Sequence, residues 1–454
     1  MRLIVLAALM AGVSNEGLAQ WKGPADSTMH RVISARVTAN GSTGMVMGIV
    51  ENGKPRFVVT GVRGGPGSAP LDPSTIFEIG SISKVFTTTL LAQMVVAGEV
   101  SLDDPAQKFL PAGVTMPSKD GKPITLLDLA TASSGLPRLP ALEPADSANP
   151  YSDYGEEQLY AFLSRHTLTR SPGERYEYSN LGMGLLGHLL SLKAGVPYEQ
   201  LVIQRILRPL GMKETWITIP PAQRARLAQG HNRDLEAVGP WAFDVLAGAG
   251  GWRSTPKDMA RFLAAMLSPP TTALGRALTM AVQSRRPTGM TDISIGLGWH
   301  IIDRNGQPLT FHNGETGGYH SYLGFNPVTG ANVLILAASA NDIDDIGMHQ
   351  VDSTIPRRDP VVRPTVTVSE GLLEQYVGNY ALAPTFAIEI TRQGDRLFLR
   401  ATNQQQFRLH AASETRFFVK EVPAEIGFVR DASGRVSSLV LYQNGQEAPG
   451  RKVR

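Results

Sequence analysis

The stretch Ser81-Ile82-Ser83-Lys84 decides how this chain is interpreted. It follows an apolar run and a glycine, Gly80, and it opens a segment that is predicted to be helical as far as Ala97. Because three residues make almost one helical turn, we expect the amine of Lys84 to lie beside the hydroxyl of Ser81. A serine hydroxyl becomes a strong nucleophile when a base takes its proton, and burial lowers the pKa of a lysine so that its neutral amine can be that base. The stretch therefore predicts a nucleophilic serine.

The same spacing also admits a purely structural interpretation. A second copy, Ser254-Thr255-Pro256-Lys257, occurs later in the chain. A serine or threonine followed by a proline in the first turn is typical of a helix start, which is what we predict for this copy. Taken alone, Ser81 could likewise be a helix cap with Lys84 in solvent, so further residues must distinguish the two interpretations.

Composition sets broad limits on the protein. The 454 residues are enough for two or three domains, and the hydrophobic fraction of 42% is enough for a sizeable core. The net charge is +3 and no long basic run occurs, so nothing indicates a nucleic-acid partner. The chain has no cysteine, which excludes disulfide bonds and cysteine metal ligands.

Residues 1–19 have the pattern of a secretory signal peptide. Arg2 is followed by the apolar segment 3–13, and the small residues at 17–19 suit a cleavage site. The apolar segment is too short to span a bilayer, which takes roughly 20 residues, and we expect no membrane span elsewhere. We therefore expect an exported protein of the bacterial periplasm whose mature chain starts near Gln20.

The mature chain begins with a region of mixed α and β character, which we expect to form one domain over residues 20–355. Asn52-Gly53 lies between two apolar runs and predicts a β-hairpin. Later elements are expected as strands at 296–302, 322–325 and 332–339 and as a last helix at 343–350.

The C-terminal region has a different pattern. Three prolines punctuate a basic stretch that we interpret as a linker over residues 356–370. Residues 371–454 contain short apolar runs separated by turn residues, which predicts a small antiparallel β domain of the barrel or sandwich type. Its strands are expected at 387–391, 397–401, 406–410, 416–420, 425–430 and 436–442.

Two further motifs carry candidate functional groups. In Tyr178-Ser179-Asn180 the phenol could transfer protons and the amide could orient a carbonyl, although a tyrosine at a helix start is commonly a packing residue. His312-Asn313-Gly314 lies between two predicted strands and is followed by Glu315. A glycine at a strand edge lets a ligand approach the backbone, where an N–H group could stabilise an oxyanion together with that of Ser81. A glycine-rich loop with a solvated histidine is the alternative.

Other kinds of site are not indicated. The remaining histidines form no metal-binding motif, and the chain has neither a Gly-x-Ser-x-Gly elbow nor a glycine-rich phosphate loop. We therefore predict no metal site and no cofactor.

Taken in order, Ser81-x-x-Lys84, Tyr178-x-Asn180 and His312-x-Gly314 resemble the class C serine β-lactamase and low-molecular-weight penicillin-binding protein family. The resemblance covers roughly residues 30–350. It implies an α/β (α+β) fold in which an antiparallel sheet is flanked by helices and joined to a helical lobe. The predicted β domain, barrel-like and all-β, would be an addition at the C-terminus.

The resemblance also implies roles for single residues. Ser81 would be the nucleophile that becomes acylated, Lys84 its base partner, and Tyr178 the group that carries protons to the leaving nitrogen and activates the deacylating water. The N–H groups of Ser81 and Glu315 would form the oxyanion hole. The implied substrate-binding residues are Asn180, His312, Asn313, Gly314 and Glu315.

Two departures bear on the substrate. Lactamases of the family usually have a lysine where this chain has His312, and a serine is common where it has Glu315. Both changes weaken the binding of a β-lactam carboxylate. The leading hypothesis is hydrolysis of β-lactams. The alternatives are a D,D-carboxypeptidase or endopeptidase acting on cell-wall peptides, a carboxylesterase acting on small esters, and a non-catalytic binding module. The oligomeric state stays open.

Overall fold

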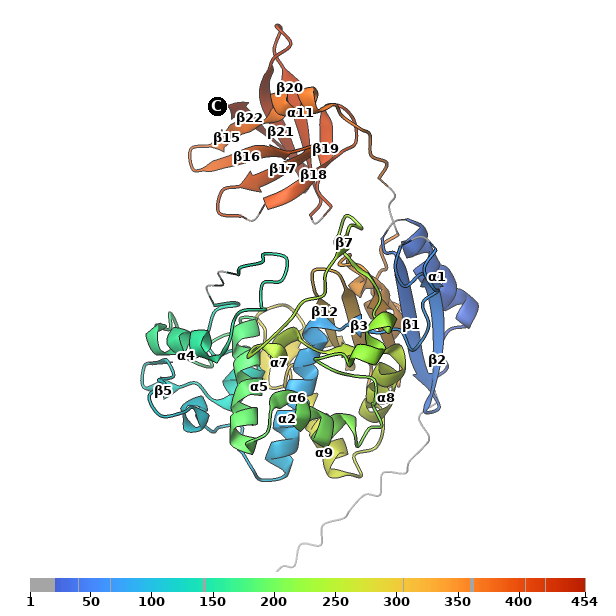
Figure 1. Cartoon of the computed structure of the whole chain (residues 1–454), viewed down its shortest axis with the longest axis vertical. Coiled ribbons are helices and arrows are strands. Elements are labelled where there is room, and N and C mark those ends of the chain that lie inside the picture. The colour runs from blue at the N-terminus through green and yellow to red at the C-terminus, as the bar shows by residue number, and fades with distance from the viewer. Residues whose placement is uncertain are drawn as a thin grey trace, which may run out of the picture. The chain divides into compact units, whose positions relative to one another are not determined.

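A computed structural model describes residues 21–39, 41–65, 67–140, 142, 144–304, 306–359, 363–404, 406–420 and 422–453. The predicted signal peptide, residues 1–19, lies outside the described residues. The chain divides into two compact units, Met1–Pro360 and Val361–Arg454 (Figure 1). The predicted linker, residues 356–370, spans the boundary between the two units.

The first unit is built on an antiparallel sheet with the strand order β2-β1-β14-β13-β12-β11-β10-β9. The strands are β1 (Gly44–Glu51), β2 (Lys54–Gly61), β9 (Arg286–Pro287), β10 (Ile293–Ile295), β11 (His300–Arg304), β12 (Gln307–Glu315), β13 (His320–Phe325) and β14 (Asn332–Ala337). The predicted hairpin is confirmed, because β1 and β2 pair and turn at Asn52 and Gly53, which have φ of +54° and +72°. Tight hairpin turns require such positive φ angles.

Helices and short ribbons complete this unit. The α-helices are α1 (Asp26–Thr38), α2 (Ser83–Val96), α3 (Leu126–Ala130), α4 (Glu156–Arg165), α5 (Asn180–Ala194), α6 (Tyr198–Val202), α7 (Ala247–Gly250), α8 (Pro256–Met266), α9 (Ala273–Ala281) and α10 (Asp344–Val351). The other helical segments are the 3₁₀ turns η1 (Gly80–Ile82), η2 (Ala106–Phe109) and η4 (Pro221–Arg226) and the π-helical turn η3 (Ile203–Leu207). The ribbons pair β3 (Phe77–Glu78) with β8 (Arg253–Ser254), β4 (Ser118–Lys119) with β5 (Lys122–Pro123), and β6 (Gly230–His231) with β7 (Ala237–Val238).

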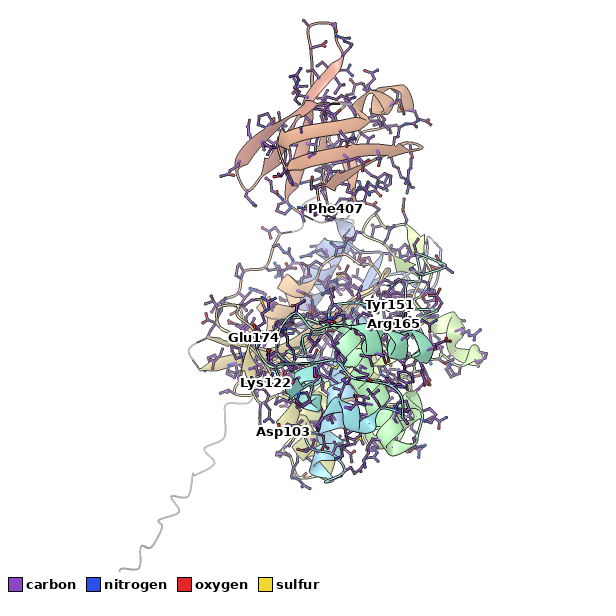
Figure 2. All side chains as sticks on the ribbon, turned by 90° about the vertical axis from the view of Figure 1, so that its left-hand side faces the viewer. Asp103, Lys122, Tyr151, Arg165, Glu174 and Phe407 are labelled. Atoms are coloured by element: carbon purple, nitrogen blue, oxygen red, sulfur yellow. The ribbon has the colours of Figure 1, made fainter. Side chains whose placement is uncertain are left out.

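Helices cover both faces of the sheet. Alternate residues of a strand point to opposite faces: Met45 and Met47 of β1 pack in one apolar cluster with α1 and α10, whereas Val46 and Val50 belong to a second cluster on the opposite face. Helix α8 contacts β1 and β14, and that second cluster includes residues of α2 and α5. The helical lobe, with Tyr151 and Arg165, faces the viewer in Figure 2. The predicted antiparallel sheet flanked by helices, with a helical lobe, is therefore confirmed.

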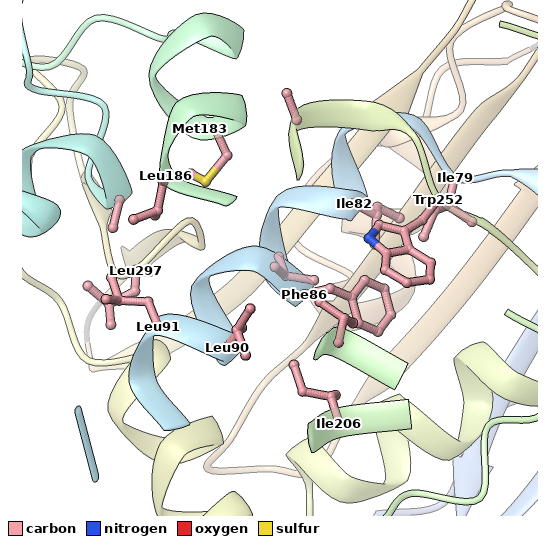
Figure 3. Packing of buried hydrophobic residues seen from close by; sticks show 14 of the residues in the cluster. Ile79, Ile82, Phe86, Leu90, Leu91, Met183, Leu186, Ile206, Trp252 and Leu297 are labelled. Atoms are coloured by element: carbon pink, nitrogen blue, oxygen red, sulfur yellow. The ribbon is translucent and has the colours of Figure 1, made fainter. Parts of the chain in front are cut away.

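Helix α2 lies at the centre of the second cluster and is buried on nearly all sides. Figure 3 shows its Phe86 packed against Trp252, with ring centroids 6.0 Å apart, and Leu91 close to Leu297. Helices α5, α7 and α9 also contact α2. A helix that is apolar all round belongs in a core, so the one lysine near its start, Lys84, is carried into the interior.

Two local predictions have clear outcomes. The second Ser-x-x-Lys copy does begin a helix, because the Thr255 hydroxyl accepts the N–H of Asp258 and Pro256 occupies the first position of α8. The strand predicted at 296–302 is partly wrong, since β11 begins only at His300. Gly298 has φ of +75° and the N–H of Gly296 donates to the carbonyl of Trp299, so residues 296–299 form a turn.

The second unit is a closed antiparallel barrel, as predicted. After α11 (Glu370–Tyr376) its strands are β15 (Gly378–Ala383), β16 (Phe386–Gln393), β17 (Arg396–Ala401), β18 (Gln406–Ala411), β19 (Arg416–Phe418), β20 (Ala424–Arg430), β21 (Val436–Gln443) and β22 (Gln446–Lys452). Pairing of β15 with β22 closes the barrel. Neither of these two strands was predicted, nor was α11. The rings of Tyr376 and Phe428, 4.0 Å apart, stack in the barrel core.

None of the helices in the described part of the chain has the length and apolar character needed to cross a membrane.

Candidate active site

Ser81 and Lys84 meet at the start of α2. The chain enters this helix through the turn η1, which contains Ser81, and Lys84 follows in the first turn of α2. The Nζ of Lys84 donates to Ser81 Oγ at 2.9 Å and to the carbonyl oxygen of Ala249 at 2.7 Å. The helix cap with a solvated lysine does not describe this geometry, because Lys84 is 2% exposed and aimed at the serine.

The surroundings of Lys84 favour its neutral form. Burial lowers the pKa of Lys84 well below its ordinary value, and the positive charge of Arg138 lowers it further. A neutral amine has a lone pair that can take the proton of a hydroxyl 2.9 Å away. The arrangement can therefore activate Ser81 as a nucleophile.

Tyr178 contacts the same serine oxygen. Its hydroxyl donates to Ser81 Oγ at 2.7 Å, and its ring lies 4.7 Å from Lys84 Nζ. Burial raises the pKa of Tyr178 above its ordinary value, and the nearby Arg138 does not outweigh this. Tyr178 is therefore a neutral phenol in the free protein, a donor to Ser81 and not a phenolate base.

Asn180 begins α5, directly after the Ser179 side chain that caps the helix by accepting the N–H of Gly182. Its amide Nδ2 donates to the hydroxyl of Tyr151 at 3.2 Å. Its Oδ1 is buried and has no partner among the described residues. An unpaired buried oxygen is costly, and it could accept an N–H group of a bound substrate amide.

Strand β12 closes against the segment that precedes Ser81. A Cβ on Gly314 would lie 2.1 Å from the carbonyl oxygen of Ile79, and a Cβ on Gly80 would lie 2.7 Å from the nitrogen of Glu315. Glycine is therefore required at both positions of this contact. Gly80 also has φ of +49°, a conformation that other residues rarely adopt.

The close contact places two backbone N–H groups near the nucleophile. The N–H of Thr316 donates to the carbonyl oxygen of Tyr319, in the pairing with β13. In an antiparallel pair, successive N–H groups of a strand point alternately toward the partner strand and away from it. The N–H of Glu315, one residue earlier, therefore points away from β13. Pairing of β12 with β11 extends only to Phe311. The N–H of Glu315 thus points toward the segment of Ser81, whose own N–H belongs to a first helical turn with unpaired donors. This pair can form an oxyanion hole.

His312 lies on the same face of β12 as Gly314 and carries no charge at neutral pH. It is 1% exposed, and its Nδ1 is 2.6 Å from the carbonyl oxygen of Asn313. Burial lowers the pKa of His312 well below its ordinary value, and the neighbouring His300 and Lys84 lower it further. The third motif therefore has no cation where the resembling lactamases have a lysine.

Asn313 and Glu315 are not directed at the serine. Asn313 lies on the opposite face of β12 from His312, and its Nδ2 donates to Asp344 Oδ2 at 2.5 Å. Glu315 is exposed and forms an ion pair of 2.7 Å with Arg233. Only the backbone of Glu315 faces Ser81, and its negative charge is offset by a partner.

Sequence reasoning missed other residues around Ser81. The hydroxyl of Tyr176 lies 3.0 Å from His300 Nε2, and burial lowers the pKa of His300 to about 4. Burial raises the pKa of Tyr176 to about 12. The guanidinium of Arg138 lies 4.9 Å from the centre of the Tyr178 ring. A partial signal was the position of Arg138 directly after Ser134-Gly135-Leu136-Pro137, a segment that also fits the family.

One cluster in the described part of the chain could in principle hold a metal ion. The ligand atoms of His320, Asp342 and Asp344 lie within 4.8 Å of one another. Arg358 already binds Asp342 at 2.6 Å and Asn313 binds Asp344, so these carboxylates have protein partners. The cluster lies on the face of the sheet turned away from Ser81.

Comparison with known proteins adds to this geometry. A family model described as beta-lactamase matches residues 29–349, and one described as a domain of unknown function (DUF3471) matches residues 362–452. A beta-lactamase of Escherichia coli K12 is 30% identical over 345 residues, which cover 68% of this chain and 87% of that protein. A beta-lactamase of Pseudomonas fluorescens is 29% identical over 350 residues, covering 69% and 92%. The D-alanyl-D-alanine-carboxypeptidase/endopeptidase AmpH of Escherichia coli K12 is 31% identical over 351 residues, covering 72% and 88%.

Proposed function

The chain belongs to the beta-lactamase family of serine hydrolases, and we propose that it forms an acyl-enzyme at Ser81 and hydrolyses the amide bond of β-lactam antibiotics. One observation carries the proposal: a single hydroxyl, Ser81 Oγ, is contacted by both the amine of Lys84 and the phenol of Tyr178. A base and an acid on one nucleophile are what acyl transfer requires.

The first half of the reaction forms the ester. Lys84 takes the proton of Ser81 as Oγ attacks the carbonyl carbon, and the N–H groups of Ser81 and Glu315 stabilise the oxyanion. When the C–N bond breaks, Tyr178 gives its proton to the leaving nitrogen and regains one from Lys84. In the second half water attacks the ester and gives a proton to Tyr178 while Tyr178 passes its own proton to Lys84. Lys84 then returns a proton to Ser81 Oγ as the C–O bond of the ester breaks.

A second candidate function is the hydrolysis of D-alanyl peptides by a D,D-carboxypeptidase or endopeptidase. The neutral His312 favours the endopeptidase, because β12 then offers no cation and the internal bond that an endopeptidase cleaves has no free terminal carboxylate beside it. The similarity to AmpH is as high as that to the beta-lactamases. Both activities share the same acyl-enzyme at Ser81.

We also propose that the protein is exported to the periplasm. The signal-like pattern of residues 1–19 supports this. The cell-wall peptides and the antibiotics named above are encountered in that compartment.

Mass spectrometry of the intact protein with a penicillin, combined with turnover of a chromogenic cephalosporin, tests the function. We expect a covalent adduct in the wild type, and its loss in Ser81→Ala and Lys84→Ala. Lys257→Ala is the matched control, because Lys257 belongs to the second Ser-x-x-Lys copy and its amine donates to Ser74 Oγ, at 2.7 Å, and not to Ser81. Rapid turnover supports a β-lactamase, whereas a long-lived adduct with release of D-alanine from a peptide supports the peptidase. A wild-type protein that forms no adduct contradicts both.

A further inference from the structure

Arg138 is fixed beside two residues of the candidate active site. Its carbonyl oxygen accepts the N–H groups of Asn180 at 2.9 Å and Leu181 at 3.3 Å, which ties it to the start of α5. Its guanidinium lies 4.9 Å from the centre of the Tyr178 ring, within the range of a cation–π contact. The backbone and the ring together place this side chain against the ring of Tyr178, the residue whose hydroxyl donates to Ser81.

Arg138 has no carboxylate partner among the described residues. It is exposed, and no carboxylate in the described part of the chain forms an ion pair with it. Contact with a ring face leaves the N–H donors at the edge of a guanidinium available for a carboxylate. Such a free cation beside a reaction centre suits an anionic group of the substrate.

The other basic groups near Ser81 cannot supply that charge. Burial lowers the pKa values of Lys84, His300 and His312, which favours the neutral form of all three. Arg233 is already paired with Glu315. Of these basic groups, Arg138 is therefore the one that offers a positive charge to a substrate at Ser81.

Its position also indicates which part of the substrate it contacts. Arg138 adjoins Asn180, whose unpaired Oδ1 can accept the amide N–H on the acyl side of the bond to be cleaved. Strand β12, which would carry the family's lysine, approaches the segment of Ser81 through Gly314 and Glu315. A carboxylate held by Arg138 would thus belong to the acyl side chain.

We propose that Arg138 selects substrates whose acyl group carries a carboxylate, through an ion pair at the mouth of the site. The inference rests on the proposed acyl-enzyme at Ser81. It predicts a substrate class: penicillins with an acidic side chain, or peptides with an acidic side chain in the residue that precedes the cleaved bond.

Two penicillins provide the test. Benzylpenicillin and α-carboxybenzylpenicillin (carbenicillin) share the lactam, the ring carboxylate and the phenyl group, and differ only in the carboxylate of the acyl side chain. We expect Arg138→Gln to lower kcat/KM for the carboxylated compound about 10-fold more than for benzylpenicillin. Arg138→Lys should keep part of the preference, and high salt should reduce it in the wild type. Arg31→Gln on the exposed side of α1 removes the same charge and should leave the ratio unchanged.

The outcomes separate the inference from the proposed function. If Arg138→Gln leaves the ratio of the two kcat/KM values unchanged, the role of Arg138 is overturned, while the proposed acyl-enzyme stands. If neither penicillin acylates the wild type, the proposed function fails. A pair of p-nitrophenyl esters, the butyrate and the carboxylated glutarate monoester, then still decides the role of Arg138 through the same ratio.

Discussion

Gly80→Ala tests whether the contact between η1 and β12 builds the oxyanion hole. At φ of +49° an alanine costs about 1–2 kcal/mol of stability. Its Cβ would lie 2.7 Å from the nitrogen and 2.9 Å from the oxygen of Glu315. Relief of this overlap requires β12 to move away by roughly 0.7 Å or more, which takes the N–H of Glu315 out of position. We expect kcat for a chromogenic cephalosporin to fall about 100-fold or more.

A second glycine provides the control for backbone strain. Gly98 follows the C-terminus of α2, has φ of +71°, and a Cβ there would meet nothing within 4 Å. Gly98→Ala should therefore lower the Tm through strain alone and leave kcat close to that of the wild type. If the two variants have kcat values within threefold of each other while both remain folded, the contact at Glu315 does not shape the reaction centre and the reasoning is refuted.

Two further predictions concern titration. Burial lowers the pKa of Lys84, and the charge of Arg138 lowers it further. Arg138→Gln should therefore raise this pKa and move the acid limb of the pH profile of kcat/KM to higher pH, measured with the uncharged substrate p-nitrophenyl acetate. An acid limb that does not move contradicts the role of Lys84 as the base. Burial alone would lower the pKa of His320, but the hydrogen bond and charge of Asp344 outweigh it and raise that pKa above its ordinary value. This stabilisation is present below the unfolded-state pKa and is lost as the pH rises through the folded-state pKa. Asp344→Asn should therefore lower the Tm more at about pH 5.5 than at about pH 8.5, and an equal loss at both pH values would contradict it.

The sequence predicted that Ser81 and Lys84 meet, because one helical turn fixes their local geometry. The place of Tyr178 beside them was implied by the resemblance to the family. The sequence did not reveal that Asn313 faces away from Ser81, although strand alternation places His312 and Gly314 on one face and Asn313 on the other. To apply strand alternation here, one must first recognise this segment as a strand, and its glycines obscure the strand pattern.

Pairing between distant segments could not be predicted in the same way. Strand β22, with the sequence Gln-Glu-Ala-Pro-Gly-Arg-Lys, has too few apolar residues to indicate a strand, yet it pairs with β15 and closes the barrel. His300 shows the same limit at the site. Its ring lies 5.4 Å from that of His312 only because β11 and β12 pair in this register. The residues within one strand do not indicate which distant strand it pairs with.

The site divides proton transfer and charge recognition between chemically different groups. Burial favours the neutral forms of Lys84 and His312, which suits Lys84 for taking a proton and removes His312 as a cation. A guanidinium keeps its charge in proteins, so Arg138 can attract an anion at every pH at which Lys84 is neutral. Substrate binding through Arg138 and activation of Ser81 then operate over the same pH range. A lysine in place of Arg138 could not guarantee this, since a bound substrate would desolvate its ammonium group and lower its pKa.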